Sequence, residues 1–321
     1  MRATITGAGM TDEAKRFRYS TSSLADYKAC PLSHFFKREL GLKVVELDHK
    51  AEHHRAFGSA VHEALDLLYK MHPLERAIEA FHASYPEQLD PEDQAKTKEA
   101  GEAMLREYFD HYSSHRDRTG DELDPNWIPR SCEVLERFQG YVDAEFVVKL
   151  DLVVEDAQTG NIYGIDHKVT KRALSSYNSW DFWNRFDPHS QITRYYSWIE
   201  KEFGRCDGFY VNAIGMYYRS RAYKGEPAGA YRKFGRQLFH RTSEQLAAER
   251  TDTMRWIEDL ESARAAHLAG VPGAWRANTE HCPFCDFRDG ICKPGYQWPQ
   301  DRDLIRLTWE EKGNALWRNG A

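Results

Sequence analysis

The sequence contains no apolar run long enough to cross a membrane, and its first twenty residues lack the apolar segment that secretion signals carry. We therefore expect an intracellular, cytoplasmic protein that binds no membrane. The pattern G-x-x-x-x-G-K-[ST] is also missing, which excludes ATP hydrolysis by a P-loop. Any unwinding of a duplex would then come from a partner protein.

Cysteine and net basic charge are both scarce. Six cysteines among 321 residues do not suggest a disulfide scaffold in an intracellular protein, yet three of them fall in one short run. The 44 lysines and arginines are outnumbered by 50 acidic residues, which gives a net charge of −6. This balance does not indicate a nucleic-acid-binding protein by itself, although a local basic groove can lie on an acidic molecule.

The chain does show an alternation of helical and strand-like segments without a repeat, which predicts a mixed α/β or α+β fold. Helical spacing of apolar residues, capping residues and β-rich runs mark these segments. The predicted helices cover residues 20–40, 54–70, 74–84, 91–112, 187–204 and 243–270, and the predicted strands cover 131–138, 144–155, 161–170, 206–218 and 231–242.

Two neighbouring predicted strands carry acids and are joined by the turn "DAQTG". If the turn centres on its Gln-Thr pair, Asp151 lies opposite Asp166, and Lys168 follows on the same face. Two carboxylates this close are costly unless a cation neutralises them, and hard oxygen ligands suit Mg²⁺ or Mn²⁺. Such an ion activates water, which the lysine positions or deprotonates. The alternative is a solvated face with a surface ion pair.

The segments "KLDLVVE" and "GNIYGIDHKVT" together resemble the metal-binding hairpin of the PD-(D/E)xK nucleases, specifically their RecB-like branch. "GSAVH" places His62 where this branch has a metal-ligand histidine, and "QITRY" matches its Q-x-x-x-Y helix. Taken alone, His62 reads as a partly buried helix histidine and Tyr195 as core. The resemblance runs from about residue 22 to residue 292, and it departs from the common pattern in having Asp rather than Glu at position 166.

The resemblance implies a restriction-endonuclease-like α/β core, a central mixed sheet flanked by helices, with a helical N-terminal insert. It also implies a role for each matching residue. Asp151, Asp166 and His62 would hold the metal together with the backbone carbonyl of His167. Lys168 would orient the water, and the catalytic set would be completed by Gln191 and Tyr195, which would place the DNA.

Four cysteines form a second pattern. "HCPFCDFRDGIC" gives C-x2-C-x6-C, and "YKACP" supplies a fourth thiol. Four thiolates bind either zinc or an iron–sulfur cluster, and spacing alone does not separate them. The pattern resembles that of the AddB nucleases and the CRISPR-associated RecB-like exonucleases, which implies a four-iron four-sulfur cluster that staples the two ends of the domain. Its ligands would be Cys30, Cys282, Cys285 and Cys292. Cys132 and Cys206 read as small buried apolar residues.

Basic and aromatic residues alternate from Tyr217 to Arg241. Cations that follow a phosphate backbone and rings that stack on bases suit single-stranded nucleic acid. The alternative is a solvated hairpin with core aromatics. The predicted DNA contacts are Arg219, Arg221, Lys224, Arg232, Lys233 and Arg236, with further phosphate contacts from Lys171, Arg172, Arg185 and Arg194.

These patterns predict a Mg²⁺- or Mn²⁺-dependent DNA exonuclease that acts on single strands or DNA ends. Its pathway would be phage or bacterial recombination and repair, or CRISPR adaptation with a partner protein. The alternative is a catalytically idle iron–sulfur scaffold that binds DNA. The predicted layout has tails at 1–18 and 301–321 and a nuclease domain at 19–300, divided into a mostly helical part (19–130), a catalytic core (131–242) and a long helix with the cysteine cluster (243–300).

Overall fold

The structure is a computed structural model. It describes residues 18–44, 49–85, 88, 90–113, 123–124, 126–139, 145–172, 174, 180–222, 227–293 and 309–311. The chain divides into two compact units. The central unit comprises Leu47–Leu135 and Lys149–Glu249, and the terminal unit comprises Met1–Glu46, Glu136–Val148 and Arg250–Ala321.

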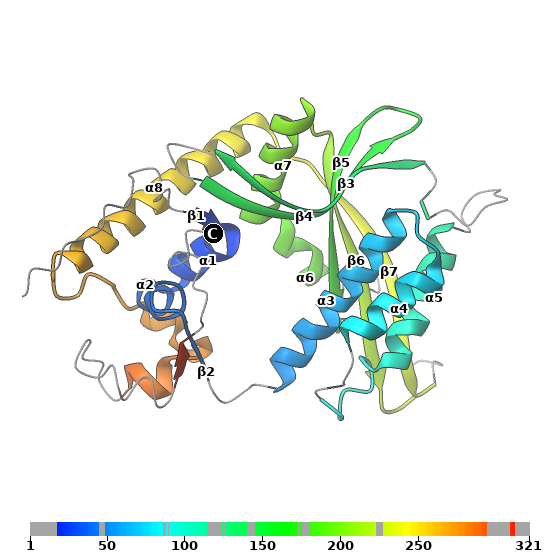
Figure 1. Cartoon of the computed structure of the whole chain (residues 1–321), viewed down its shortest axis with the longest axis horizontal. Helices are drawn as coiled ribbons and strands as arrows, with labels where there is room; N and C mark the ends of the chain where they lie inside the picture. Colours follow the sequence, from blue (N-terminus) through cyan, green and yellow to red (C-terminus); the bar gives the residue numbers. More distant parts are fainter. Residues whose placement is uncertain are drawn as a thin grey trace, which may run out of the picture. The chain divides into compact units, whose positions relative to one another are not determined.

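A mixed sheet runs through the central unit (Figure 1). Five of its six strands are β3 (Trp127–Gln139), β4 (Glu145–Asp156), β5 (Ile162–Thr170), β6 (Gly208–Arg219) and β7 (Gly229–Phe239), and the sixth is β1 (Arg18–Ser20) of the terminal unit. Strand β4 pairs with β3 and runs antiparallel to β5, β5 runs parallel to β6, and β6 runs antiparallel to β7. The parallel step from β5 to β6 is made through helix α7 (Ser190–Phe203), as a parallel pair requires a crossover connection.

Helices α3 (His49–Tyr69), α4 (Leu74–Ser84) and α5 (Lys98–Ser113) pack on one face of this sheet (Figure 1). Helix α3 presents Phe57, Val61, Leu65 and Leu68 at helical spacing, and all four are buried in the core that also contains Ile165 of β5. The apolar periodicity of the sequence therefore decides which side of α3 meets the sheet.

Helix α7 covers the opposite face, and a glycine makes its close approach possible. A Cβ atom on Gly164 would lie 2.6 Å from Ile199 Cδ1 of α7 and 2.4 Å from the ring of Phe209. Only glycine fits there. Because side chains alternate along a strand, Gly164 and Ile165 point to opposite faces, and β5 is buried on both. Asp166 and Lys168 share the α7 face with Gly164.

A short helix lies between β5 and α7 in the sequence. It is α6 (Trp180–Trp183), followed by a 3-10 turn over Asn184–Phe186. Phe182 and Phe186 of this segment are buried and pack edge to face, with ring centroids 5.3 Å apart.

In the terminal unit, β1 (Arg18–Ser20) runs parallel to the first residues of β4, and a capping box formed by Ser20 and Ser23 starts α1 (Thr21–Ala29). Then follow α2 (Pro31–His34), a π-helical turn (Phe35–Glu39) and β2 (Leu42–Val44), which pairs antiparallel with β8 (Trp309–Glu311). Helix α8 (Ser243–Leu268) begins in the central unit and continues here, ahead of a 3-10 helix (Thr279–Phe284) and a π-helical turn (Arg288–Cys292).

Aromatic rings fill the core of the terminal unit. Trp275 stacks on Phe35 with ring centroids 5.2 Å apart, and it lies edge to face with Tyr27 at 6.4 Å. The Leu32 amide donates to the carbonyl of Arg276 at 3.0 Å. These contacts bring the first helices next to the cysteine-rich segment, although more than 200 residues separate them in the sequence.

The structure confirms an α/β fold with a mixed sheet flanked by helices. The predicted helix over 91–112 begins only at Lys98, because residues 90–97 form turns. Within the predicted tail at 301–321, Trp309–Glu311 form a strand, and the remaining residues of both predicted tails lie outside the described residues except Arg18. The helical insert and the domain boundaries stay predictions. None of the described helices combines the length and apolar character needed to cross a bilayer.

Candidate active site

The β4–β5 hairpin has the register that the sequence predicts. Leu152 pairs with Ile165, and Asp151 and Asp166 are the next residues beyond this last pair on each strand. Both acids are buried, with 8% and 4% of their surface exposed. Asp151 Oδ2 accepts a hydrogen bond from the backbone amide of His167 at 2.7 Å, which fixes its carboxylate at the hairpin.

Two basic side chains face these acids. His62 reaches from α3, and its Nδ1 lies 3.2 Å from Asp151 Oδ1. The Lys168 ammonium lies 2.6 Å from Asp166 Oδ2. The structure therefore brings together four of the predicted site residues, which come from one helix and two strands.

Burial and neighbouring charges shift the pKa values of the two carboxyl groups in opposite directions. Burial, with the charge of Asp151, raises the pKa of Asp166 to about 6 against the opposing effect of Lys168. Burial also acts to raise the pKa of Asp151, but the hydrogen bond and charge of His62 overcome it and lower that pKa to about 2. Two carboxyl groups buried in one site behave in this way, because deprotonation of the second group is unfavourable unless a cation is bound nearby.

The donor set suits a divalent cation. Two carboxylates and an imidazole are ligands that Mg²⁺ and Mn²⁺ accept in proteins. His62, Asp151 and Asp166 do not all come within 4.8 Å of one another in this structure, and Asp166 is instead paired with Lys168. The Lys168 ammonium therefore lies beside the Asp166 carboxylate, which would also attract a metal ion.

The pKa of Asp166 sets a pH dependence for the metal-free chain. Between its ordinary pKa of 3.8 and about 6, folded Asp166 keeps a proton that the unfolded chain releases. The contribution of Asp166 to folding stability should therefore decline as pH rises through this window, by an amount on the order of 2 kcal/mol. His53, His54 and His189 contribute in the opposite direction because their pKa values are lowered, so the parent is compared with Asp166→Asn by urea unfolding with a chelator at pH 4.5 and pH 7. The variant should lack the Asp166 contribution, and an identical pH dependence of the two proteins would contradict the assignment.

Gln191 and Tyr195 lie on one face of α7, as predicted. Gln191 Nε2 donates to the Tyr195 hydroxyl at 2.8 Å. Tyr195 is 5% exposed and its ring lies 5.9 Å from that of Phe209. The tyrosine is thus a core residue whose polar end is held by Gln191, and the role of the pair toward DNA stays a prediction.

His167 belongs to a buried polar network behind the site. Its ring stacks on Tyr69 with centroids 5.6 Å apart, and its Nδ1 accepts from Asn212 Nδ2 at 2.7 Å. The Asn212 amide also donates to the Tyr108 hydroxyl at 2.8 Å. The imidazole is a packing group, so any metal contact would come from its carbonyl, which stays a prediction.

Arg236 corrects one predicted DNA contact. Its guanidinium forms two 2.7 Å bonds to Asp124, donates to the hydroxyls of Tyr69 and Tyr108 and to Asn212, and is only 13% exposed. The sequence pattern could not tell this arginine from its exposed neighbours. Arg194 is a second correction, because it is 2% exposed and pairs with Glu249 at 3.0 Å.

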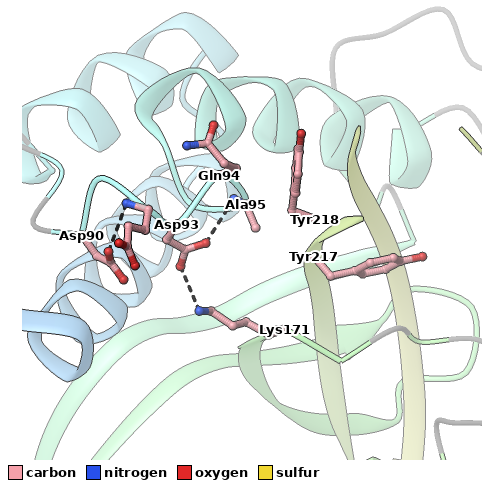
Figure 2. Close-up of a pocket in the computed structure, with 8 residues that line it drawn as sticks. Asp90, Asp93, Gln94, Ala95, Lys171, Tyr217 and Tyr218 are labelled. Carbon is pink, nitrogen blue, oxygen red and sulfur yellow. Dashed lines mark hydrogen bonds and ion pairs between the residues drawn. The ribbon is translucent and has the colours of Figure 1, made fainter. Parts of the chain in front are cut away.

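The remaining residues predicted to contact DNA differ in their exposure and in their partners. The Arg219 guanidinium lies 4.8 Å above the ring of Tyr231, which stacks on Tyr217 with centroids 5.4 Å apart. Arg221 and Lys233 are exposed, Arg232 Nε donates to Glu107 at 2.8 Å, and Lys224 lies outside the described residues. Lys171 lies on the wall of a groove of about 410 Å³ opposite Tyr217 and Tyr218 (Figure 2).

His189 is a residue that the sequence analysis missed. It caps α7 at its N-terminus, and its Nδ1 is buried with no hydrogen-bond partner among the described residues. Burial lowers the pKa of His189, and the charges of Lys168, Arg241 and Arg194 lower it further. It is therefore a neutral imidazole near Lys168. A single histidine before a helix carries no pattern that would have revealed it.

The four predicted cluster cysteines lie in the terminal unit as free thiols. Cys30 is buried, and its sulfur accepts from the Asn278 amide at 3.4 Å. Burial, followed by the charges of Cys285, Cys282 and Cys30, raises the pKa of Cys292 to about 11. No three of these described sulfurs lie within 4.8 Å of one another, whereas four thiolates on one zinc ion would be about 3.8 Å apart. Cys206 is a buried apolar residue as predicted, and the Cys132 side chain lies outside the described part.

One comparison with known proteins identifies the superfamily. Residues 18–293 match the model of the PD-(D/E)XK nuclease superfamily, so the chain belongs to this superfamily, whose members cut nucleic acids with divalent metals. A crystal structure named "Putative exonuclease" from Eubacterium rectale is similar at 14% identity, with a TM-score of 0.44, over 94% of this chain and 99% of the other. A search of curated proteins gives no significant match.

Proposed function

We propose that the protein is a Mg²⁺- or Mn²⁺-dependent DNA exonuclease of the RecB-like branch, acting on single strands or DNA ends. The observation that carries the proposal is the burial of Asp151 and Asp166 one position beyond the last pair of the hairpin, with His62 and Lys168 in contact with them. A solvated strand face would not raise the pKa of a carboxyl group to about 6. An idle scaffold would have no use for this costly arrangement.

The metal, when bound, supplies an activated water and neutralises charge that develops on the phosphate. His62, Asp151 and Asp166 would hold it. The charge of Asp166 raises the pKa of Lys168 although burial opposes it, so this side chain is an ammonium at neutral pH. Lys168 therefore acts as a hydrogen-bond donor that positions water or a phosphate oxygen, rather than as the base.

The single-stranded substrate is supported by the aromatic and basic side chains on β6 and β7. Tyr217 and Tyr231 form a stacked pair with Arg219 above both rings, at 5.3 Å and 4.8 Å. Rings and guanidinium groups of this kind stack on bases of any sequence. Exposed Arg221 and Lys233 would add phosphate contacts.

The experiment is degradation of linear single-stranded, linear double-stranded and circular single-stranded DNA of equal length, with Mn²⁺. An exonuclease should shorten the linear single strand progressively and leave the circle intact. Cutting of the circle would show endonuclease activity. No cutting of any substrate by the folded, metal-loaded chain would support the scaffold instead. The biological pathway, recombination and repair or CRISPR adaptation, stays a prediction.

We also propose that Cys30, Cys282, Cys285 and Cys292 bind a four-iron four-sulfur cluster. The proposal is supported by the cysteine spacing and by the place of all four cysteines in the terminal unit. The cluster would join Cys30 to the segment around Cys285 and couple folding to cluster binding. Protein purified anaerobically should absorb visible light, and Cys30→Ser should lose the colour. Cys206→Ser, which removes a buried thiol outside the set, should keep it. Colourless parent protein containing zinc would contradict the cluster.

A further inference from the structure

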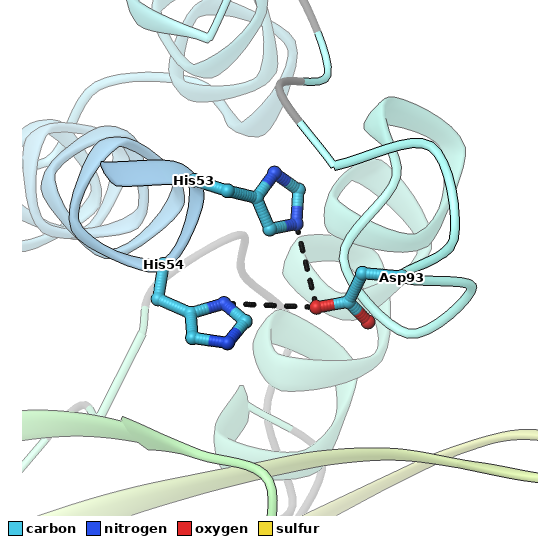
Figure 3. A group of neighbouring side chains, drawn as sticks. All are labelled: His53, His54 and Asp93. Carbon is cyan, nitrogen blue, oxygen red and sulfur yellow. Dashed lines mark ion pairs between the residues drawn. The ribbon is translucent and has the colours of Figure 1, made fainter. Parts of the chain in front are cut away.

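A second group of metal-ligand side chains lies in the central unit away from the acidic hairpin. His53 and His54 of α3 both turn toward the carboxylate of Asp93, in the turn before α5 (Figure 3). His53 Nε2 lies 3.4 Å and His54 Nδ1 lies 3.6 Å from Asp93 Oδ2. Adjacent helix residues point about 100° apart, so the two rings approach the same oxygen from different sides.

The three facing atoms form no well-aligned hydrogen bond. His53 Nε2, His54 Nδ1 and Asp93 Oδ2 are all buried and meet no hydrogen-bond geometry among the described residues, although the Lys171 ammonium forms an ion pair with Asp93 Oδ2. A buried polar atom without a hydrogen bond is costly. The two imidazole nitrogens therefore face the carboxylate oxygen without a hydrogen bond that would satisfy them.

The contacts of His53 fix the orientation of its ring. The Tyr85 hydroxyl donates to the Lys96 carbonyl at 3.0 Å, and its oxygen lies 2.8 Å from His53 Nδ1. The Asp90 amide also donates to Nδ1, at 3.4 Å. These contacts at Nδ1 hold the ring so that Nε2 faces Asp93. A histidine held by a second partner in this way is the usual arrangement at a metal site.

The charge state of the cluster also favours a metal ligand set. Burial lowers the pKa of His53 and of His54, and Lys96 and Lys171 lower that of His54 further. Asp93 also has a lowered pKa, because Lys171 and a backbone amide outweigh burial. Two neutral imidazoles and one carboxylate are the forms that bind a metal.

We propose that His53, His54 and Asp93 bind a transition-metal ion such as Zn²⁺, at a site separate from the catalytic one. Ligands at ordinary zinc distances in a tetrahedron are about 3.3 Å apart, close to the two spacings measured here. Nitrogen and carboxylate donors together favour zinc or a neighbouring first-row metal over Mg²⁺. His62 is nine residues further along α3, about 13 Å along the helix axis, so one ion does not serve both sites.

Lys171 occupies the position of the cation in the metal-free chain. Its ammonium lies 3.1 Å from Asp93 Oδ2, and both residues line the groove of Figure 2. Metal binding would free Lys171, which follows the end of β5, to face the groove with Tyr217 and Tyr218. The site would also tie the first turns of α3 to the turn that contains Asp93.

The test is the number of Zn²⁺ ions that the full chain retains after equilibrium dialysis. His54→Ala and Asp93→Asn should each retain about one ion fewer per chain than the parent. The control, His240→Ala, removes an exposed histidine and should match the parent. Because cysteine and catalytic sites are the same in all four proteins, the difference reports this cluster alone. Equal counts in the four proteins would overturn the proposal.

A second measurement covers the case in which Asp93→Asn fails to fold. Zn²⁺ should raise the unfolding temperature of the parent and of His240→Ala more than that of His54→Ala, whose side chain is 34% exposed and can be replaced without a large cavity. Lys171→Met removes the competing ammonium, so its affinity for Zn²⁺ at this site should rise roughly two- to fivefold. Equal thermal shifts in the parent and His54→Ala would also overturn the proposal.

Discussion

Replacing Asp166 with asparagine is expected to lower the rate of DNA hydrolysis by roughly a thousandfold, a loss of about 4 kcal/mol of transition-state stabilisation. Asparagine keeps the size of the side chain but removes the charge that attracts the metal and pairs with Lys168 at 2.6 Å. The measurement is the initial rate of shortening of end-labelled single-stranded DNA with saturating Mn²⁺.

Asp110→Asn is the matched control, because it neutralises an exposed acid on α5 in the same unit. Its rate should equal that of the parent. Asp166→Asn should remain folded, since it removes a buried group whose charged form is disfavoured. A folded Asp166→Asn protein that cuts DNA at the parental rate would remove the acidic hairpin from the active site.

Replacing Arg236 with alanine is expected to lower the free energy of unfolding by about 3–5 kcal/mol, because Asp124 would remain buried without its partner. The guanidinium also donates to Tyr69, Tyr108 and Asn212, which would lose these bonds together. Urea unfolding measures the loss.

Arg221→Ala is the control for this change, since it removes an exposed arginine that the sequence grouped with Arg236. Its free energy of unfolding should stay within about 0.5 kcal/mol of the parent. The double variant Arg236→Met, Asp124→Asn removes both charges, keeps a residue that tolerates the φ of 47° at position 124, and should recover part of the loss. A loss below about 1 kcal/mol for Arg236→Ala would show that the arginine is not a structural residue.

The hairpin could be predicted from the sequence because its geometry is local. A short turn fixes the pairing of two strands, and this register brings Asp151 and Asp166 to adjoining positions at the end of the ladder. Helix α3 followed from apolar spacing for the same reason. The position of His62 in the site was predicted from the resemblance to the family motif, because no local spacing in the sequence indicates it.

What the sequence could not decide was which polar residues are buried together. Arg236 and Arg221 look alike in a basic, aromatic stretch, and only the fold places Asp124 beside one of them. His53 and Asp93 are 40 residues apart, joined by a helix, a turn and a second helix, so no spacing rule connects them. Contacts between distant segments depend on packing, which a single sequence does not display.

Titration of the metal-free chain with Mn²⁺ tests most directly whether the two hairpin acids share a divalent ion. The bound ion can be counted by electron paramagnetic resonance in the parent, in Asp151→Asn and in Asp166→Asn, with His54→Ala as a control for the second cluster. The parent and His54→Ala should bind the ion at the hairpin with equal affinity, and each asparagine variant should bind it at least about tenfold more weakly. Unchanged Mn²⁺ binding in both asparagine variants would contradict a metal site at the hairpin.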